Sequence, residues 1–294
     1  MALAERLENM RFAPASMPPK ESLPTMYELP SEDPQEPGLP DEFHHYQPQL
    51  LRETFKPPVC ERDRIFIGTD IHLYYDPYHT LWYKRPDWFA VVDHSRFYFN
   101  GDLRYSYVIW QEQVVPFCVV ELLSPGTQDE DLGRMPWDNA GPPPKWVVYE
   151  QILQVPYYLL YDRKDKVFMA YRWTEGHYQQ LPVAQERLWL PEIGLGIGTW
   201  EGEFDGFHNK WLRWYDERGW IPTLAEAQEQ ERQRAEQEQQ RAEQEKRRAE
   251  HEKQHAEQEK QRAEQEKERA EQADQRAAKL AAQLRALGID PEAE

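Results

Sequence analysis

The segment FCVVELLSPGT, residues 117–127, combines an apolar run, one internal acid and a turn. The apolar run favours a buried β-strand, and Ser124-Pro125-Gly126 is typical of the turn that ends such a strand. Glu121 lies within the run, with two apolar residues on either side, so its carboxylate should be partly buried. An unpaired buried carboxylate is costly, and burial raises its pKa. The segment therefore predicts a core strand whose acid requires a cation or a lysine as its partner.

Further apolar and aromatic runs on both sides of this segment predict a sheet. They cover residues 64–68, 71–75, 88–92, 107–110, 117–123, 157–161, 167–173 and 178–182. Asn100-Gly101 and Glu175-Gly176 lie between such runs and indicate hairpins. Helical spacing occurs at 41–55, where Pro48 restricts where a regular helix begins, and at 145–155, after three prolines. Helices among strands predict an α/β fold with a mixed sheet.

Composition divides the chain into three parts. Residues 1–40 are rich in Pro and Glu and predict a flexible lead-in. Residues 41–222 contain the large apolar and aromatic side chains that can bury a core. Residues 223–294 lack aromatic side chains and form a polar heptad repeat, in which Ala recurs at every seventh position from Ala235 to Ala277.

The heptad tail predicts one long charged helix. A strong coiled coil needs two large apolar positions in each heptad, whereas here one is Ala and the other is Glu or Gln. Only Leu280, Leu284 and Leu287 supply an ordinary apolar seam. A solitary charged helix and a coiled coil therefore both remain open.

Charge and cysteine content restrict the classes of function. The net charge is -18; the tail from Thr223 onward holds 14 Lys or Arg and 19 Asp or Glu, which gives it -5 and leaves -13 for the body. This balance weighs against strong non-specific binding to nucleic acid, but a local basic groove or a bound metal ion remains compatible with it. Cys60 and Cys118 have no metal-binding spacing, and no segment resembles a signal peptide or a membrane span. We therefore expect reduced thiols, a cytoplasmic location and no membrane association.

Three charged residues occur where the pattern predicts strand or core. Asp87 precedes the apolar run at 88–92, Glu121 lies inside the next core strand, and Lys145 begins the second helix. Two carboxylates at neighbouring strand ends suit Mg²⁺ or Mn²⁺, and a lysine can orient a water molecule or stabilise developing charge. The same residues also fit a purely structural reading, a turn at Pro86-Asp87 and an ion pair at Glu121.

The order of these residues resembles a known bacterial family. Pro86-Asp87, residues 119–127, Lys145 with Tyr149, and residues 155–162 are similar to the restriction endonuclease domain family, which is abundant in cyanobacteria. The family belongs to the PD-(D/E)xK nuclease superfamily, and the resemblance covers residues 41–215. It implies a restriction-endonuclease-like mixed sheet flanked by helices, with a long C-terminal charged helix.

The resemblance also implies roles for individual residues. Asp87 and Glu121 would be metal ligands, and with Lys145 they would form the catalytic set. The superfamily places its lysine two residues after the second acid, which here is Leu123; in this family the lysine moves to the following helix. That points to Lys145, with Arg134 as the alternative.

Five other polar residues are candidates near this site. Glu53 would be an additional acid, whereas Asp70 and Asp131 are interpreted as structural. His44 and His45, near the start of the first helix, are interpreted as solvated surface residues.

The function implied is hydrolysis of DNA phosphodiester bonds with Mg²⁺ or Mn²⁺, with DNA as substrate and a possible homodimer. The alternative is a non-catalytic protein that keeps the nuclease fold and uses its helical tail for assembly. An RNA-directed or repair nuclease is a third reading.

Overall fold

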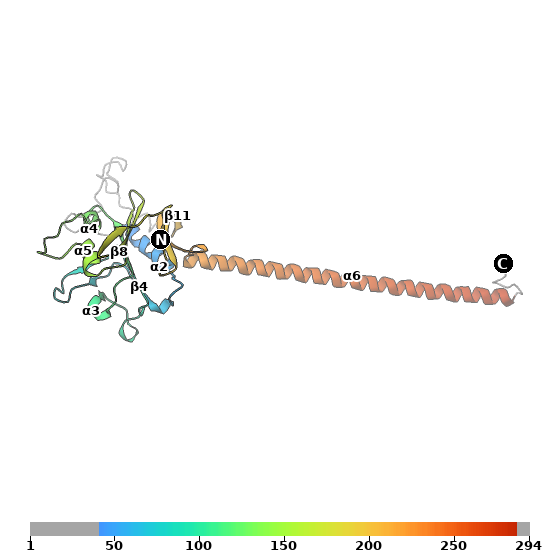
Figure 1. The fold of residues 1–294 in the computed structure, drawn as a ribbon. Coiled ribbons are helices and arrows are strands. Elements are labelled where there is room, and N and C mark those ends of the chain that lie inside the picture. Colours follow the sequence, from blue (N-terminus) through green and yellow to red (C-terminus); the bar gives the residue numbers. More distant parts are fainter. Residues whose placement is uncertain (1–40, 287–294) are drawn as a thin grey trace, which may run out of the picture. The chain divides into compact units, whose positions relative to one another are not determined.

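The computed structural model describes residues 41–286, and the chain divides into two units, Met1–Thr223 and Leu224–Glu294 (Figure 1). The predicted lead-in at 1–40 lies outside the described residues. Within residues 41–286, no helix is both long and apolar enough to cross a membrane.

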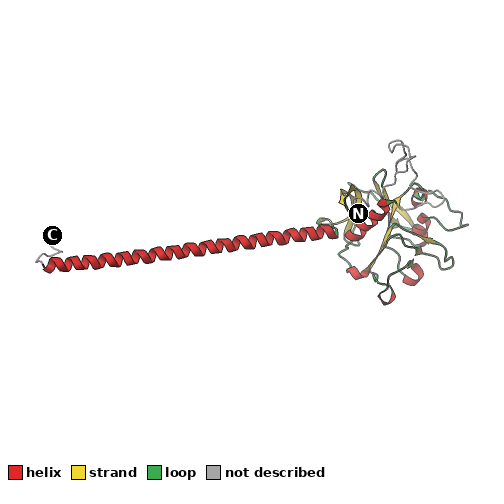
Figure 2. Cartoon of the chain, turned by 180° about the vertical axis from the view of Figure 1, so that it is seen from behind, coloured by secondary structure: helices red, strands yellow, loops and turns green. Residues whose placement is uncertain are grey.

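Three sheets and several short helices build the first unit (Figure 2). The central sheet has the strand order β1-β4-β6-β7-β8-β9, with β1 Ile65–Gly68, β4 Trp88–Val92, β6 Cys118–Leu123, β7 Tyr157–Asp162, β8 Val167–Thr174 and β9 His177–Gln180. A second sheet contains β10 Arg187–Leu190, β11 Leu195–Phe204, β12 Phe207–Asp216 and β13 Gly219–Trp220; a small third sheet contains β3 Tyr83–Lys84, β2 Leu73–Tyr74 and β5 Tyr107–Val108. The helices are α2 Glu42–Thr54, η2 Arg62–Arg64, η3 Phe99–Gly101, α3 Ile109–Glu112, α4 Gln128–Asp131, α5 Lys145–Val147 and η4 Val148–Ile152.

The central sheet is mixed, because β6 and β7 pair in parallel while its other neighbours pair antiparallel. Alternate side chains of β6 pack into two separate cores. Val120 and Leu122 belong to the core shared with α2 and the second sheet, and Val119 and Leu123 belong to the core on the other face. By this alternation Glu121 faces the second core, beside η4. The predicted α/β class with a mixed sheet is confirmed.

Helix α2 packs against β12 and begins earlier than the proline suggested. Asp41 caps it by accepting a hydrogen bond from the backbone N–H of His44 at 3.1 Å. Pro48 lies inside the helix and is buried, so one helical hydrogen bond is lost in its interior. The buried Gln47 side chain bonds both backbone groups of Leu212 on β12, each at 2.8 Å. These two hydrogen bonds hold α2 against strand β12 of the second sheet.

Several predicted elements are shorter than expected, and one is of another type. The predicted helix at 145–155 has only one α-turn and then widens into a π-turn, in which the N–H of Leu153 bonds the carbonyl of Val148 at 2.9 Å. The predicted strand at 107–110 stops at Val108, since 109–112 form helix α3.

One of the two predicted hairpins is absent from the described sheets. Asn100-Gly101 is a turn with positive φ at both residues, but no strands of the described sheets meet at it. The hairpin at Glu175-Gly176 is confirmed, because Thr174 pairs with His177.

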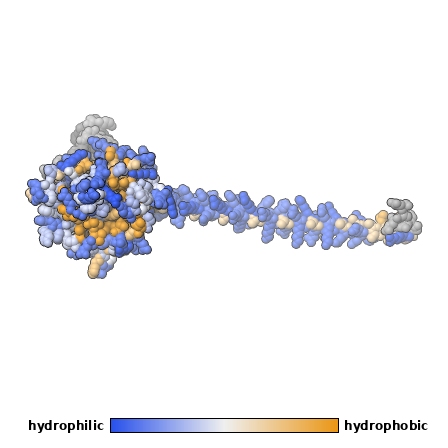
Figure 3. Space-filling view, viewed as in Figure 1, coloured by the Kyte–Doolittle hydropathy of each residue, from blue (hydrophilic) through white to orange (hydrophobic). Residues whose placement is uncertain are grey.

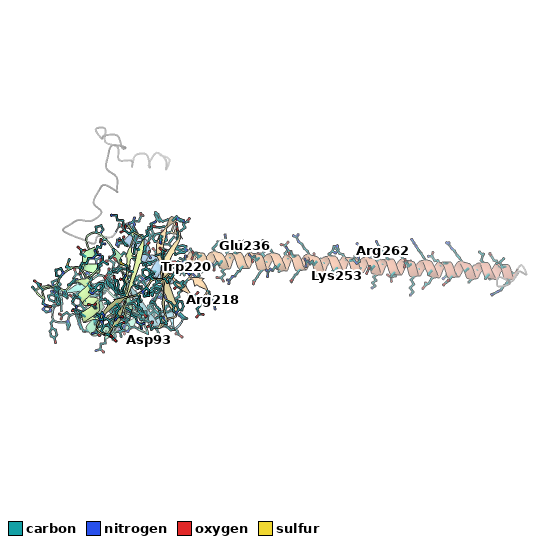
Figure 4. The ribbon with its side chains drawn as sticks, turned by 45° about the horizontal axis from the view of Figure 1, so that its top comes forward. Asp93, Arg218, Trp220, Glu236, Lys253 and Arg262 are labelled. Carbon is teal, nitrogen blue, oxygen red and sulfur yellow. The ribbon has the colours of Figure 1, made fainter. Side chains whose placement is uncertain are left out.

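The second unit contains α6, a helix of 63 residues from Leu224 to Ala286. At 1.5 Å per residue it is about 95 Å long. None of its described residues is buried, and the face shown in Figure 3 is mostly polar, with small apolar patches along it. Glu236, Lys253 and Arg262 project outward from it (Figure 4). The predicted charged helix is confirmed; the coiled coil stays a prediction, and Leu287 of its apolar seam lies outside the described residues.

Gly68 on the edge strand β1 provides a test of sheet packing. A Cβ at Gly68 would lie 2.1 Å from the ring of Phe89, its cross-strand partner on β4. Gly68→Ala is therefore expected to lower the free energy of unfolding by about 1–3 kcal/mol through overpacking. Gly141→Ala is the matched control, because no atom lies within 4 Å of the added methyl. Urea unfolding of the two variants would measure the difference, and equal stabilities would contradict the packing argument.

Candidate active site

Asp87 and Glu121 lie opposite each other where β4 and β6 meet. Trp88 pairs with Val120 in antiparallel register, so Asp87, directly before β4, stands across from Glu121. The backbone N–H of Asp87 lies 3.4 Å from Glu121 Oε2, and Asp87 Oδ2 accepts a hydrogen bond from the N–H of Leu122 at 2.6 Å. The two predicted acids are thus brought together, although they are 34 residues apart in sequence.

Side chains from the following helix occupy both oxygens of Glu121. Lys145 donates through Nζ to Oε2 at 3.0 Å, and Tyr149 donates its hydroxyl to Oε1 at 2.9 Å. Glu121 and Tyr149 are fully buried, whereas the Lys145 side chain is 13% exposed. The two donors are four residues apart, which places them on the same side of α5 and its π-turn. The predicted lysine therefore reaches the predicted acid.

Asp131 is a member of the cluster whose contact with the lysine the sequence did not indicate. Its Oδ1 lies 2.9 Å from Lys145 Nζ, outside regular hydrogen-bond geometry, and its Oδ2 accepts from the Thr127 hydroxyl at 2.8 Å. The side chain is fully buried at the end of α4. The structure places Asp131 against the same ammonium group that contacts Glu121, and a structural role for Asp131 stays a prediction. Asp70, by contrast, pairs with Arg85 at the surface.

The cluster contains more negative than positive charge, since Asp87, Glu121 and Asp131 face one ammonium group. Burial raises the pKa of Glu121 well above its usual range, Lys145 opposes that rise, and the charges of Asp87 and Asp131 add to it. Burial also raises the pKa of Asp131, again opposed by Lys145. Burial lowers the pKa of Lys145, but Asp131 and Glu121 outweigh it and raise this pKa. A further cation or a proton would balance the group.

A second layer of contacts holds Lys145 in place. Glu130 accepts the backbone N–H of Lys145 at 2.8 Å through Oε1, and the same oxygen pairs with Lys84 Nζ at 2.6 Å. Burial raises the pKa of Glu130, but Lys84 and Lys145 outweigh it and leave the pKa below its ordinary value. The start of α5 is therefore anchored to α4 by a charged side chain.

The prediction of a solvated surface for His44 is wrong. Its side chain is 12% exposed, with Nδ1 2.8 Å from Asp41 Oδ1 and Nε2 3.2 Å from the carbonyl oxygen of Leu122. Burial lowers the pKa of His44, but Asp41 and Asp87 outweigh it and raise this pKa; the same pairing leaves the pKa of Asp41 at about 2, against the opposing effect of burial. His45, in contrast, is exposed. Because α2 folds over the end of β6, His44 adjoins the acids from a site 78 residues away in sequence.

The two remaining candidates lie apart from the cluster. The Arg134 side chain is 62% exposed, and its closest carboxylate is that of Asp129 at 3.7 Å. Glu53 is nine residues beyond His44 on α2, which is about 13 Å along the helix. Leu123, in the usual lysine position, is buried among apolar residues.

A surface cavity of about 370 Å³ opens beside Asp87. Its walls include Asp41, His44, Thr69 and Asp70. Asp87 is partly exposed and lines this cavity, whereas Glu121 lies behind it in the protein interior. Asp87 is therefore the member of the acid pair that a molecule entering from solvent would meet first.

The donor set at this position fits a small divalent cation. Within residues 41–286 no group of three or more His, Cys, Asp and Glu side chains is arranged to hold a metal ion. Mg²⁺, however, is commonly held by one or two carboxylates, with water and substrate phosphate completing its shell. Asp87 and Glu121 are two such carboxylates, and Asp87 Oδ1 accepts no hydrogen bond from the described part of the chain. Their oxygen chemistry suits Mg²⁺ or Mn²⁺.

A mixed sheet with two opposed acids at a strand end and a lysine from the following helix defines a restriction-endonuclease-like protein. The family model described as "Putative restriction endonuclease" (Uma2) matches residues 16–201, more than half of the chain. The chain belongs to this family, as its motifs indicated, and membership suggests a nuclease. Among curated proteins, none matches the chain.

Proposed function

We propose that this protein is a metal-dependent endonuclease that hydrolyses DNA phosphodiester bonds. The observation that carries the proposal is the contact of Lys145 Nζ with Glu121 Oε2 at 3.0 Å, directly across from Asp87. Family membership supports the same class of reaction. Asp87 and Glu121 would bind Mg²⁺ or Mn²⁺, which would make a bound water more acidic and polarise a phosphate oxygen.

The chain's own residues would perform the remaining tasks. Lys145 is an ammonium at neutral pH, so it would orient the attacking water and stabilise negative charge rather than accept a proton. Asp131 and Glu121 hold that ammonium between them, which fixes its direction. The Tyr149 hydroxyl holds the second oxygen of Glu121, which prevents the carboxylate from rotating. Asp87 would meet the substrate at the wall of the cavity.

Glu121→Gln tests this proposal. The amide keeps the volume of the side chain but loses the charge that a metal ion requires, so cleavage of plasmid and single-stranded DNA with Mg²⁺ or Mn²⁺ should fall by about 100-fold or more. EDTA should abolish cleavage by the wild-type protein. Asp129→Asn is the control, because Asp129 is an exposed acid on the same helix as Asp131. Undiminished cleavage by Glu121→Gln would refute this site.

One observation favours a second candidate, the non-catalytic interaction protein. Glu121 is fully buried and both of its oxygens already have donors, an arrangement that a structural ion pair would also show. Thermal unfolding with Mn²⁺ separates the two candidates. A working acid pair would be stabilised by about 2.7 kcal/mol at 100 times the Kd, and Glu121→Gln would remove the gain. An unchanged Tm in the wild-type protein would favour the non-catalytic candidate.

A further inference from the structure

Four arginines line a second cavity, of about 270 Å³, beside the edge strand β1 of the central sheet; Arg104 is paired with Glu112, and the other three carry the argument. Arg52 comes from α2, Arg62 from η2, and Arg96 from the loop after β4. Phe97, which is 46% exposed, lines the same cavity. We call this set the arginine cavity.

The three guanidinium groups form no ion pair with a carboxylate anywhere in residues 41–286. Neighbouring arginines do: Arg64 pairs with Asp93 at 2.8 Å, and Arg104 pairs with Glu112 at 2.8 Å. Burial and the charge of Arg96 both lower the pKa of Arg52, and they act on Arg62 in the same way. Within residues 41–286, positive charge is thus concentrated here without a carboxylate partner, although Arg52 donates to the carbonyl of Ile67 and Arg96 lies over the Phe97 ring. The body as a whole has a net charge of -13. An anion bound in the cavity would relieve this repulsion.

The arginine cavity adjoins the cavity at Asp87, because Thr69 lines both. Helix α2 also connects them. His45 lines the acidic cavity and Arg52 the arginine cavity, and these two residues lie seven apart on one side of the helix. Seven residues rise about 10 Å, a length that a few nucleotides of a DNA strand can span. A nucleic-acid strand can therefore extend from one cavity to the other.

We propose that the arginine cavity binds backbone phosphates of a DNA strand whose reacting bond lies at the neighbouring Asp87 cavity. The choice of DNA rests on the proposed function; the choice of a phosphate chain rests on the unpaired arginines. Guanidinium groups bind phosphate oxygens with paired N–H donors. Phe97 adds a ring face against which an unpaired base can stack, so single-stranded DNA is the probe of choice.

The test is the binding of a short fluorescein-labelled single-stranded DNA, measured by anisotropy in EDTA so that no cleavage occurs. Arg52→Gln/Arg62→Gln/Arg96→Gln should weaken binding at about 50 mM salt on the order of 100-fold. The slope of log K against log salt should fall by about 2, since each lost phosphate contact with a single strand contributes about 0.7. Arg64→Gln is the matched control: it removes the same charge from η2, but its guanidinium already pairs with Asp93. It should bind nearly as the wild type does.

Two outcomes would overturn the inference: a triple variant that binds no worse than Arg64→Gln, or a wild-type protein with no measurable affinity at about 50 mM salt. Thermal unfolding checks the fold of each variant. Arg52 also donates to the carbonyl of Ile67 at 3.2 Å, so if the triple variant does not fold, Arg62→Gln/Arg96→Gln decides the question alone. Binding and cleavage separate the two proposals. Arginine-dependent binding without cleavage would support phosphate binding by the arginine cavity and refute the nuclease with its reacting bond at Asp87; cleavage with unaffected binding would do the reverse.

Discussion

Lys145→Met is expected to lower the free energy of unfolding by about 3–5 kcal/mol, because it leaves two buried carboxylates without their cation. Glu121 and Asp131 are both fully buried, and their closest positive charge is the Lys145 ammonium, at 3.0 Å and 2.9 Å. Methionine fills a similar volume, so the loss reflects charge rather than a cavity. Urea unfolding at pH 7 in EDTA, followed by tryptophan fluorescence, measures the change.

A second variant isolates the ion pair from other effects of losing the lysine. The double variant Lys145→Met/Glu121→Gln also removes the Glu121 charge that Lys145→Met leaves unpaired. It should therefore be more stable than Lys145→Met alone. Lys164→Met, at an exposed turn after β7, should change stability by no more than about 0.5 kcal/mol. If Lys145→Met matched Lys164→Met, the buried cluster would not depend on its ammonium.

Glu112→Ala should be similarly destabilising, by about 3–5 kcal/mol, because it removes the carboxylate that pairs with the buried Arg104 side chain. The Arg104 side chain is 3% exposed. It donates to the Glu112 carboxylate through two nitrogens, at 2.8 Å and 3.1 Å. His94 Nε2 lies 2.6 Å from the same carboxylate. Chemical denaturation at pH 7 would measure the loss. Glu112→Gln keeps an acceptor oxygen for Arg104 and should fall between the wild type and Glu112→Ala.

The stability that Glu112 contributes should depend on pH in a defined direction. Burial raises its pKa, but the bonds from Arg104 and His94 outweigh burial and leave the pKa below the ordinary 4.5. A carboxylate with a depressed pKa stabilises the fold above its unfolded pKa and loses this effect as the pH falls through the folded value. The gap between wild type and Glu112→Ala should therefore be full at pH 7 and shrink below about pH 4.5. A gap that widened on acidification would contradict the ion-pair interpretation.

The sequence predicted the central strands well because they are buried on both faces. Strands β4, β6 and β7 read as continuous apolar runs and appear within a residue of their expected bounds. The second sheet was not predicted, although Asp205-Gly206 joins β11 to β12 with positive φ at both residues, the sequence signature of a two-residue hairpin. Glycines that alternate along β11 broke the apolar pattern there, so local periodicity alone did not reveal the strand.

The candidate site was predictable only where residues follow the order of the family motif. Asp87, Glu121 and Lys145 were named, and the structure brings all three together. The prediction for His44 was wrong, and the contact of Asp131 with Lys145 was not predicted, because both depend on how α2 and α4 fold back onto β6. No spacing along the chain encodes a contact between a helix side chain and a carbonyl 78 residues away. Only the folded structure shows that residues such as Asp131 and His44 lie beside the site.

The length of α6 has a consequence for hydrodynamic measurements. A helix of about 95 Å with no buried residue experiences far more friction per unit mass than a compact domain. A single chain of 35.1 kDa would therefore leave a gel-filtration column early, at the elution volume of a larger compact protein. Light scattering reports mass independently of friction. It would distinguish one 35.1 kDa chain from a homodimer where an elution volume alone would suggest association.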